Sequence, residues 1–246
     1  MIPYLFNYLE ANIISIEGYT CLRKRYEYER RRLIENLVLE GVIRSEKVRD
    51  AMLNVPREEF VLEEYRKWAY LDQPLPIGYG QTISAPHMVA LMTEKLDPEP
   101  GDIVLEIGTG SGYQAAILAG IVAKRDPSRR GHVYSVERIP ELAFFARKNL
   151  EKTGYIDYVT VVVGDGTKGY PDKAPYDRII VTAAAPDIPK PLIEQLKPRG
   201  VMVIPVGDLG VQRLLIVRKS VNGEIHVLED TYCLFVPLVG EYGWRL

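Results

Sequence analysis

The sequence has only two cysteines in 246 residues, Cys21 and Cys233, and they lie far apart with no Cys-x-x-Cys pair. This distribution excludes a disulfide framework and gives no indication of a zinc site. A reducing, cytoplasmic location is therefore the one we expect. The histidines are also few and scattered, at His87, His132 and His226, so we assign no metal ligand and no general base to them.

A long apolar run is missing as well. No stretch of about 18 apolar residues occurs, and the start of the chain has no basic segment of the signal-peptide kind. We expect neither a membrane span nor secretion. The formal net charge is −2, from 31 basic and 33 acidic residues, which does not favour a nucleic acid bound mainly through its phosphates. The arginine-rich stretch at 23–32 includes Glu27 and Glu29, so we interpret it as a solvated helix face.

The length and the 47% hydrophobic content are enough for one large α/β core with a smaller N-terminal addition. We predict an N-terminal extension and helical cap over residues 1–72 and the main domain over 73–246, packed as one compact unit. Helices are indicated at 23–41 and from the N-cap Ser45 to Met52. Apolar residues at positions 2–8 suggest a contact with a second copy of the chain, and hence a homo-oligomer.

From residue 103 onward, short apolar segments alternate with helical patterns. The strands are expected at 103–107, 132–136, 159–163 and 178–182, and the helices at 113–122, 140–153 and 189–196. Such alternation predicts a doubly wound, mostly parallel sheet with helices on both faces. The β-rich segments 201–205, 213–219 and 224–229, with a type I′ turn signal at Asn222-Gly223, predict an antiparallel edge hairpin. Before the sheet, residues 72–86 read as a fixed loop and 86–96 as a helix that begins at Pro86.

The segment from Val104 to Gly112 reads Val-Leu-Glu-Ile-Gly-Thr-Gly-Ser-Gly. Glycines directly after a buried strand allow a ligand to approach the backbone, here at Gly108, Gly110 and Gly112. A dinucleotide fingerprint would need a third glycine where Tyr113 stands. Glu106 would also repel a pyrophosphate, whereas S-adenosylmethionine (AdoMet) has no phosphate and is cationic. The loop therefore favours AdoMet over a dinucleotide.

Two further acids follow the next two predicted strands. Glu137 could accept hydrogen bonds from both ribose hydroxyls, and Asp165 ends the strand after that. Carboxylates at the ends of successive parallel strands line the crevice where ligands bind in such sheets. The alternative is that each acid, including Glu106, only caps a helix or turn.

Residues 77–88 read Ile-Gly-Tyr-Gly-Gln-Thr-Ile-Ser-Ala-Pro-His-Met, which resembles the active-site loop of the protein-L-isoaspartate O-methyltransferases. Further matches occur at 161–166, 174–177, 183–186, 196–200 and 205–207, and the resemblance extends over about residues 45–244. It implies a Rossmann-like methyltransferase fold. The implied reaction moves a methyl group from AdoMet to the free α-carboxylate of L-isoaspartyl, and in some members D-aspartyl, residues of damaged proteins. This is a protein repair function, and its second product is S-adenosyl-L-homocysteine.

The resemblance assigns roles to individual residues. Ser84 corresponds to the active-site serine, which contacts both the substrate and the cofactor. Ala184, Ala185 and Pro186, which follow a strand end and are mostly small, are expected to allow a peptide to approach. The alternative is that they form only a tight turn packed by alanines. The other implied cofactor contacts are Gln81, Thr82 and Ile83 beside Ser84, Ser111 in the glycine loop, Glu137 with Arg138 at the ribose, and Asp165 with Gly166 at the adenine.

The implied chemistry fits these residues, because a carboxylate with a reference pKa of about 4 is already ionised and needs no general base. A neutral hydroxyl such as that of Ser84 can orient the carboxylate without quenching its nucleophilicity. Ser84 could instead be an N-cap for the helix at Pro86. Two functional alternatives remain open: an AdoMet methyltransferase that acts on a small molecule or RNA, and an adaptor that binds AdoMet without turnover.

Overall fold

The computed structural model describes residues 22–124, 126, 128 and 130–245. The contact surface expected at positions 2–8 lies outside these residues, as does Cys21. In the described part of the chain, no helix is long and apolar enough to span a membrane. In the same part, no three His, Cys, Asp or Glu side chains are grouped so that they could hold a metal ion.

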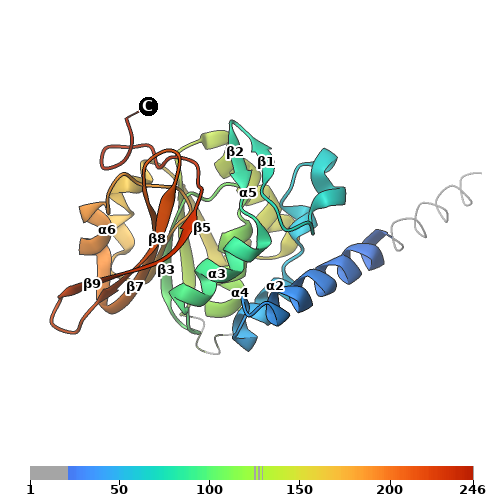
Figure 1. The fold of residues 1–246 in the computed structure, drawn as a ribbon, viewed down its shortest axis with the longest axis horizontal. Helices are drawn as coiled ribbons and strands as arrows, with labels where there is room; N and C mark the ends of the chain where they lie inside the picture. The colour runs from blue at the N-terminus through green and yellow to red at the C-terminus, as the bar shows by residue number, and fades with distance from the viewer. Residues whose placement is uncertain (1–21, 125, 127, 129, 246) are drawn as a thin grey trace, which may run out of the picture.

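A sheet of seven strands, ordered β5-β4-β3-β6-β7-β8-β9, forms the centre of the described molecule (Figure 1). The first five are parallel and β8 and β9 are antiparallel, which confirms the predicted mixed sheet with its edge hairpin. Their bounds are β3 Ile103–Ile107, β4 His132–Glu137, β5 Val159–Val163, β6 Tyr176–Val181, β7 Leu196–Gly207, β8 Gln212–Lys219 and β9 Ile225–Cys233. The chain order reverses between β3 and β6, and ligands bind at such switch points in doubly wound sheets.

Helices cover both faces of the sheet, as predicted. Successive strand residues alternate between two cores: Val104 packs in one cluster with Met92 and Leu118, and Leu105 in the other with Leu192. In Figure 1, α6 lies across the sheet from α3 and α4. The α-helices are α2 Glu46–Asn54, α3 Pro86–Leu96, α4 Tyr113–Val122, α5 Pro140–Thr153 and α6 Lys190–Gln195, preceded by a helix over residues 22–39. Short 3₁₀ segments are η1 Arg57–Glu59, η2 Glu63–Trp68, η3 Ile156–Tyr158, η4 Gly166–Lys168 and η5 Pro171–Lys173.

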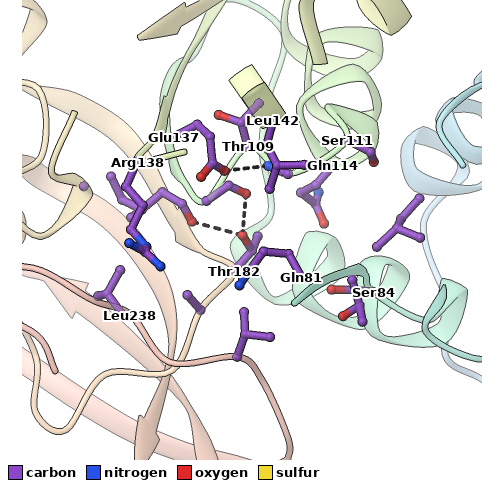
Figure 2. A pocket seen from close by; sticks show the side chains of 18 of the residues that line it. Gln81, Ser84, Thr109, Ser111, Gln114, Glu137, Arg138, Leu142, Thr182 and Leu238 are labelled. Carbon is purple, nitrogen blue, oxygen red and sulfur yellow. Dashed lines mark hydrogen bonds between the residues drawn. The ribbon is translucent and has the colours of Figure 1, made fainter. Parts of the chain in front are cut away.

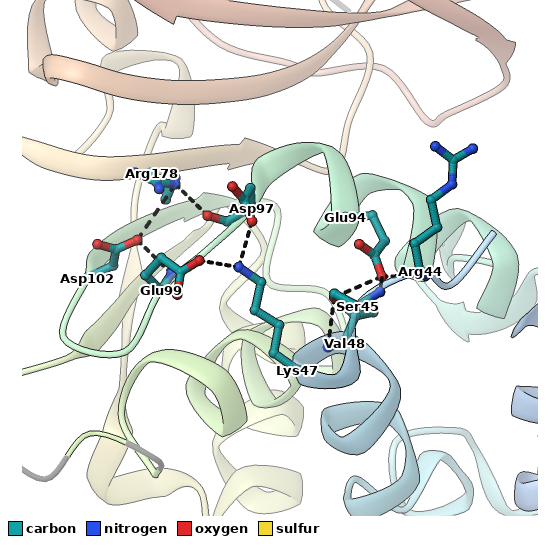
Figure 3. Close-up of polar contacts among 9 residues, drawn as sticks. All are labelled: Arg44, Ser45, Lys47, Val48, Glu94, Asp97, Glu99, Asp102 and Arg178. Atoms are coloured by element: carbon teal, nitrogen blue, oxygen red, sulfur yellow. Dashed lines mark hydrogen bonds and ion pairs between the residues drawn. The ribbon is translucent and has the colours of Figure 1, made fainter. Parts of the chain in front are cut away.

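The N-terminal helices are tied to the sheet by polar contacts as well as by the shared core. Figure 3 shows Ser45 as the predicted N-cap of α2, where its hydroxyl accepts from the Val48 amide. A carboxylate oxygen of Glu94, on α3, accepts from the Ser45 amide at 2.9 Å. Lys47 pairs with Asp97 at 2.6 Å, just beyond the end of α3. These contacts agree with one compact unit, although the boundary at residue 72 stays a prediction.

The arginine-rich helix is only partly a solvated face. Arg23 and Arg25 form exposed ion pairs with Glu27 and Glu29, as that interpretation requires. For Arg30 it is wrong, because the 12% exposed side chain pairs with Glu58 and donates to the Tyr70 hydroxyl at 2.8 Å. Sequence spacing could not show this, because Glu58 and Tyr70 lie 28 and 40 positions further along the chain.

Residues 72–86 are more regular than the expected loop. Strands β1 Leu75–Gly78 and β2 Gln81–Ile83 form an antiparallel hairpin. Its two-residue turn, Tyr79-Gly80, has positive φ at both positions, 54° and 68°, which is the geometry of a type I′ turn. Tyrosine rarely adopts such a φ, and this explains why the sequence did not indicate a hairpin here.

The edge hairpin forms where it was predicted, but the predicted turn type at Asn222-Gly223 is wrong. Only Gly223 has a positive φ there, 88°. Its amide donates to the carbonyl of Ser220 at 3.1 Å. The turn therefore spans Ser220 to Gly223 in the type I manner, with glycine taking the left-handed position at its end.

Candidate active site

One cavity, about 880 Å³ including its open mouth, lies at the carboxyl ends of β3, β4 and β6. Figure 2 shows Glu137 and Arg138 at one end of it and Ser84 at the other. Ten residues predicted from the sequence line this cavity: Gln81, Thr82, Ile83, Ser84, Gly108, Gly110, Ser111, Glu137, Arg138 and Gly166. The fold thus brings the β1–β2 hairpin, the glycine loop and the end of β4 to a single site.

In the glycine loop between β3 and α4, a side chain at Gly108 or Gly112 would come too close to a neighbouring segment. Gly108 has φ 94°, and a Cβ there would lie 2.5 Å from the Thr182 hydroxyl oxygen. Gly112 is the N-cap of α4, and its Cβ would lie 3.3 Å from Leu150 of α5. Gly112 does not line the cavity, so the close approach at this residue is to a helix, while its predicted cofactor contact stays a prediction.

Glu137, at the end of β4, is held in place by two backbone amides. One carboxylate oxygen accepts from the Gly110 amide at 2.9 Å, and the other accepts from the Ile139 amide at 3.0 Å. The side chain is 6% exposed. It is therefore a fixed, buried acceptor in the cavity wall, between the glycine loop and the start of α5, and can accept hydrogen bonds from a bound diol.

Glu106 lies behind the wall. It is fully buried and absent from the lining, and the Ser135 hydroxyl donates to one of its carboxylate oxygens. The Thr109 hydroxyl, which does line the cavity, is 2.6 Å from that of Ser135. The second carboxylate oxygen of Glu106 has no hydrogen-bond partner among the described residues. Burial raises the pKa of Glu106 to about 8, more than the Ser135 hydrogen bond lowers it.

This raised pKa gives a pH dependence of stability. The unfolded chain releases the Glu106 proton near pH 4.5, but the folded protein holds it to about pH 8. The contribution of Glu106 is therefore fully present below pH 4.5 and is lost as the pH rises to about 8. We expect the free energy of unfolding of Glu106→Gln, measured by denaturant titration at several pH values, to fall less over this range than that of the parent. Equal slopes for the two proteins would contradict the assignment.

Asp165 caps η4 and holds the end of the chain. One oxygen accepts from the Thr167 amide at 2.9 Å, and the other accepts from the Glu241 amide, also at 2.9 Å. Burial alone would raise the pKa of Asp165, but the hydrogen bonds from Thr167 and Glu241 outweigh it and lower the pKa. Asp165 itself does not line the cavity; Gly166 does, and a Cβ at Gly166 would lie 2.4 Å from Ile107.

The C-terminal segment beyond β9 completes the cavity with residues 236–239. The Ala184 amide donates to the Val236 carbonyl at 2.8 Å, and the Ala184 carbonyl accepts from the Leu238 amide at 2.8 Å. Ala185 pairs in the same way with Pro205 and Gly207 of β7. The backbone amides and carbonyls of Ala184 and Ala185 are thus already hydrogen-bonded within the chain, and Pro186 is exposed. The substrate contact expected at these three residues stays a prediction.

Ser84 lines the cavity and does not cap α3, so the alternative interpretation is wrong. The N-cap is Ala85, and the His87 amide donates to the Asp72 carboxylate at 2.8 Å. The Ser84 hydroxyl has no hydrogen-bond partner among the described residues. Its carbonyl accepts from the fully buried Arg57 at 2.8 Å. The hydroxyl is therefore available to a ligand in the cavity.

Several lining residues carried no signal in the sequence. Thr182 donates to the Gly108 carbonyl at 2.7 Å, and Gln114 donates to Thr93 at 3.0 Å. Leu142, in the first turn of α5, also lines the cavity, as do residues 236–239.

The lining fits AdoMet. Glu137 offers a fixed carboxylate, and the glycines of the loop leave its backbone accessible to a ligand. Arg138 is the only basic residue among the described residues of the wall. The described residues of the wall therefore form no cluster of cations for a pyrophosphate, and a ligand without phosphates fits the wall better. Together with the doubly wound sheet, this site defines an AdoMet-dependent methyltransferase.

The comparisons with known proteins give the family. Residues 28–243 match the model of the family described as protein-L-isoaspartate(D-aspartate) O-methyltransferase. The chain is 70% identical to the protein-L-isoaspartate O-methyltransferase of Staphylothermus marinus, over 91% of this chain and all of that protein. The enzyme of that name from Hyperthermus butylicus is 67% identical, over 88% of this chain and 90% of its own length. The chain belongs to the protein-L-isoaspartate(D-aspartate) O-methyltransferase family.

A solved structure agrees with this assignment. A Plasmodium falciparum protein, described as a putative protein-L-isoaspartate O-methyltransferase in complex with S-adenosyl-L-homocysteine, superposes with a TM-score of 0.76 at 28% identity. The superposition covers 85% of this chain and 98% of that one. The expected fold and the AdoMet dependence are thereby confirmed.

Proposed function

We propose that this protein transfers a methyl group from AdoMet to the free α-carboxylate of L-isoaspartyl residues in damaged proteins. One observation carries the proposal beyond family membership: the unpaired Ser84 hydroxyl shares a cavity with the glycine loop and Glu137. An acceptor held at Ser84 and a cofactor held at Glu137 would therefore meet inside one cavity, out of bulk water.

The residues that would hold the cofactor divide between the two ends of the cavity. Glu137 would accept from the ribose hydroxyls, and the glycine loop would present its backbone to the rest of the ligand. When bound, AdoMet supplies a methyl group on a cationic sulfur and leaves as S-adenosyl-L-homocysteine. The other proposed contacts are Gln81, Thr82, Ile83, Ser111, Arg138 and Gly166 in the wall. Glu106, Gly112 and Asp165 lie behind the wall, and the cofactor contacts expected of them stay predictions.

The wall has no group suited to removing a proton from the acceptor. Its ionisable residues, among those the structure describes, are Tyr113, Glu137 and Arg138, and Glu137 already accepts from two backbone amides. An α-carboxylate needs no base, because it is ionised at neutral pH. Ser84 would donate one hydrogen bond that aligns the carboxylate, and the buried wall would strip water from it. An alcohol or amine acceptor would lack a base here, which disfavours RNA and those small molecules that would be methylated on such a group.

The remaining expectations concern the setting of the reaction. From the few cysteines we infer that the protein acts in the cytoplasm. From the net charge of −2 we infer that it has no nucleic-acid partner. A homo-oligomer formed through the N-terminal extension is a further proposal. It is tested by the native mass of the full chain against a variant that lacks residues 1–20. An unchanged mass would count against it.

The decisive test compares two peptides that differ only in one linkage. Protein with labelled AdoMet should form a base-labile methyl ester on an L-isoaspartyl peptide and no ester on its normal aspartyl counterpart. A D-aspartyl peptide in a third reaction measures the second activity in the family description. Equal labelling of the first two peptides, or none, would refute the proposed substrate. Retained AdoMet binding without any labelling would point to the adaptor alternative.

A further inference from the structure

Arg57 is the most deeply buried charged side chain next to the proposed acceptor end of the cavity. It is 0% exposed, and its guanidinium donates to two backbone carbonyls, those of Ala69 at 2.9 Å and Ser84 at 2.8 Å. It also lies over the ring of Tyr113, 5.0 Å from its centroid, and Tyr113 lines the cavity. Arg57 thus contacts both the residue proposed to hold the acceptor and the first residue of α4.

The charge of Arg57 has no carboxylate partner within ion-pair distance among the described residues. Arg30, the neighbouring buried arginine, pairs with Glu58 at 3.1 Å. Asp72 is close enough to raise the pKa of Arg57, but it forms no ion pair with Arg57, and its carboxylate accepts from the His87 amide. One guanidinium nitrogen of Arg57, Nη1, also lacks a hydrogen-bond partner in the part of the chain that the structure describes.

A buried charge without a counter-charge in contact is costly, and here burial lowers the pKa of Arg57 more than its neighbours raise it. An anion that enters the cavity beside Ser84 would offset this cost. The acceptor of the proposed reaction is such an anion, whereas the cofactor is a cation. The charge of Arg57 therefore lies at the Ser84 end of the cavity, where the acceptor carboxylate has to bind.

We propose, on the basis of the proposed function, that Arg57 is a positioning residue that selects an ionised acceptor through the Ser84 peptide group. It does not line the cavity, so it does not grip the carboxylate. Its bond to the Ser84 carbonyl fixes the backbone that carries the hydroxyl, and its positive charge lowers the energy of an anion at that hydroxyl. Because the guanidinium attracts the acceptor carboxylate without bonding to it, the carboxylate oxygen stays free to attack the methyl group.

The test measures peptide binding, with S-adenosyl-L-homocysteine present, by calorimetry. One peptide has a free isoaspartyl α-carboxylate and the other has a neutral α-carboxamide at the same position. The parent protein should prefer the carboxylate. The neutral variants Arg57→Gln and Arg57→Met should each lose about tenfold of this preference, the order expected for a nearby charge at protein dielectric. Arg57→Lys should keep most of it, because lysine restores the charge without the paired donors.

Arg30→Gln is the matched control, since it also removes a buried arginine charge, but one that is paired with Glu58. It should lower the melting temperature and leave the carboxylate preference unchanged. In kinetics, the Arg57→Gln variant should raise KM for the isoaspartyl peptide more than it lowers kcat. Because there are two neutral variants, the carboxylate preference can still be measured on one of them if the other does not fold.

An unchanged carboxylate preference in a folded neutral variant would overturn the role of Arg57, as would a Lys variant that behaves like Gln. Failure of the proposed function has a different signature, because the parent itself would then not methylate the isoaspartyl peptide. A parent that methylates this peptide, with neutral variants that keep the full preference, removes the Arg57 proposal alone.

Discussion

Ser84→Ala is expected to lower kcat for an isoaspartyl peptide by about 10²-fold, the size of effect that follows when a reacting group loses its alignment. The hydroxyl has no partner among the described residues of the protein, and α3 is capped without it. The substitution therefore removes a contact to the acceptor and leaves the fold intact. The dissociation constant for AdoMet, measured by calorimetry, should change by less than about threefold, since a lost contact of that size is below 1 kcal/mol.

Ser111→Ala provides the matched control. Ser111 lines the same cavity from the glycine loop, and its carbonyl accepts from Asn149 at 2.9 Å, so its backbone is held independently of its hydroxyl. This variant should weaken AdoMet binding and leave kcat at saturating cofactor nearly unchanged. If Ser84→Ala keeps full turnover, or if both variants show the same pattern, Ser84 has no part in orienting the acceptor.

Glu137→Ala should weaken AdoMet binding by about 100-fold, because the variant removes a charged acceptor of two hydrogen bonds. The loss has two parts. The ribose hydroxyls lose their proposed acceptor, and the Gly110 and Ile139 amides lose the side chain that holds the loop and the start of α5. S-adenosyl-L-homocysteine should be weakened to a similar extent, since the proposed contact is to the nucleoside that both molecules share.

Glu141→Ala is the control for charge alone. Glu141 is exposed in the first turn of α5, only four residues further on. Its removal changes the net charge by the same amount without touching the cavity, so AdoMet affinity should stay within about twofold. If Glu137→Ala binds AdoMet as the parent does, the ribose end of the cavity lies elsewhere.

The sequence predicted the elements whose signals are local. The strand at Ile103–Ile107 and the helix at Tyr113–Val122 have the bounds that apolar runs and glycines indicated. Glu137 could also be placed, because the end of a parallel strand is a fixed position in the fold. The β1–β2 hairpin escaped prediction because tyrosine rarely adopts the positive φ that Tyr79 has in its turn.

Contacts between distant segments could not be predicted from the sequence. Arg57 gives no pattern that distinguishes it from a surface arginine, yet it is fully buried and bonds to Ser84, 27 positions away. Leu142 and residues 236–239 reach the cavity only through the packing of α5 and the return of the chain past Ala184. A single sequence without related sequences carries no record of such pairs.

The C-terminal segment has a consequence for the order of events when the protein is made. Val236 to Val239 form part of the wall, and the amides of Glu241 and Tyr242 bond to Asp165 and Thr167. Residues 236–242 are all synthesised after the seven strands of the sheet. The cofactor cavity can therefore close only after the whole sheet has been synthesised, so a chain terminated before Val236 would contain every strand and still lack part of its cavity wall.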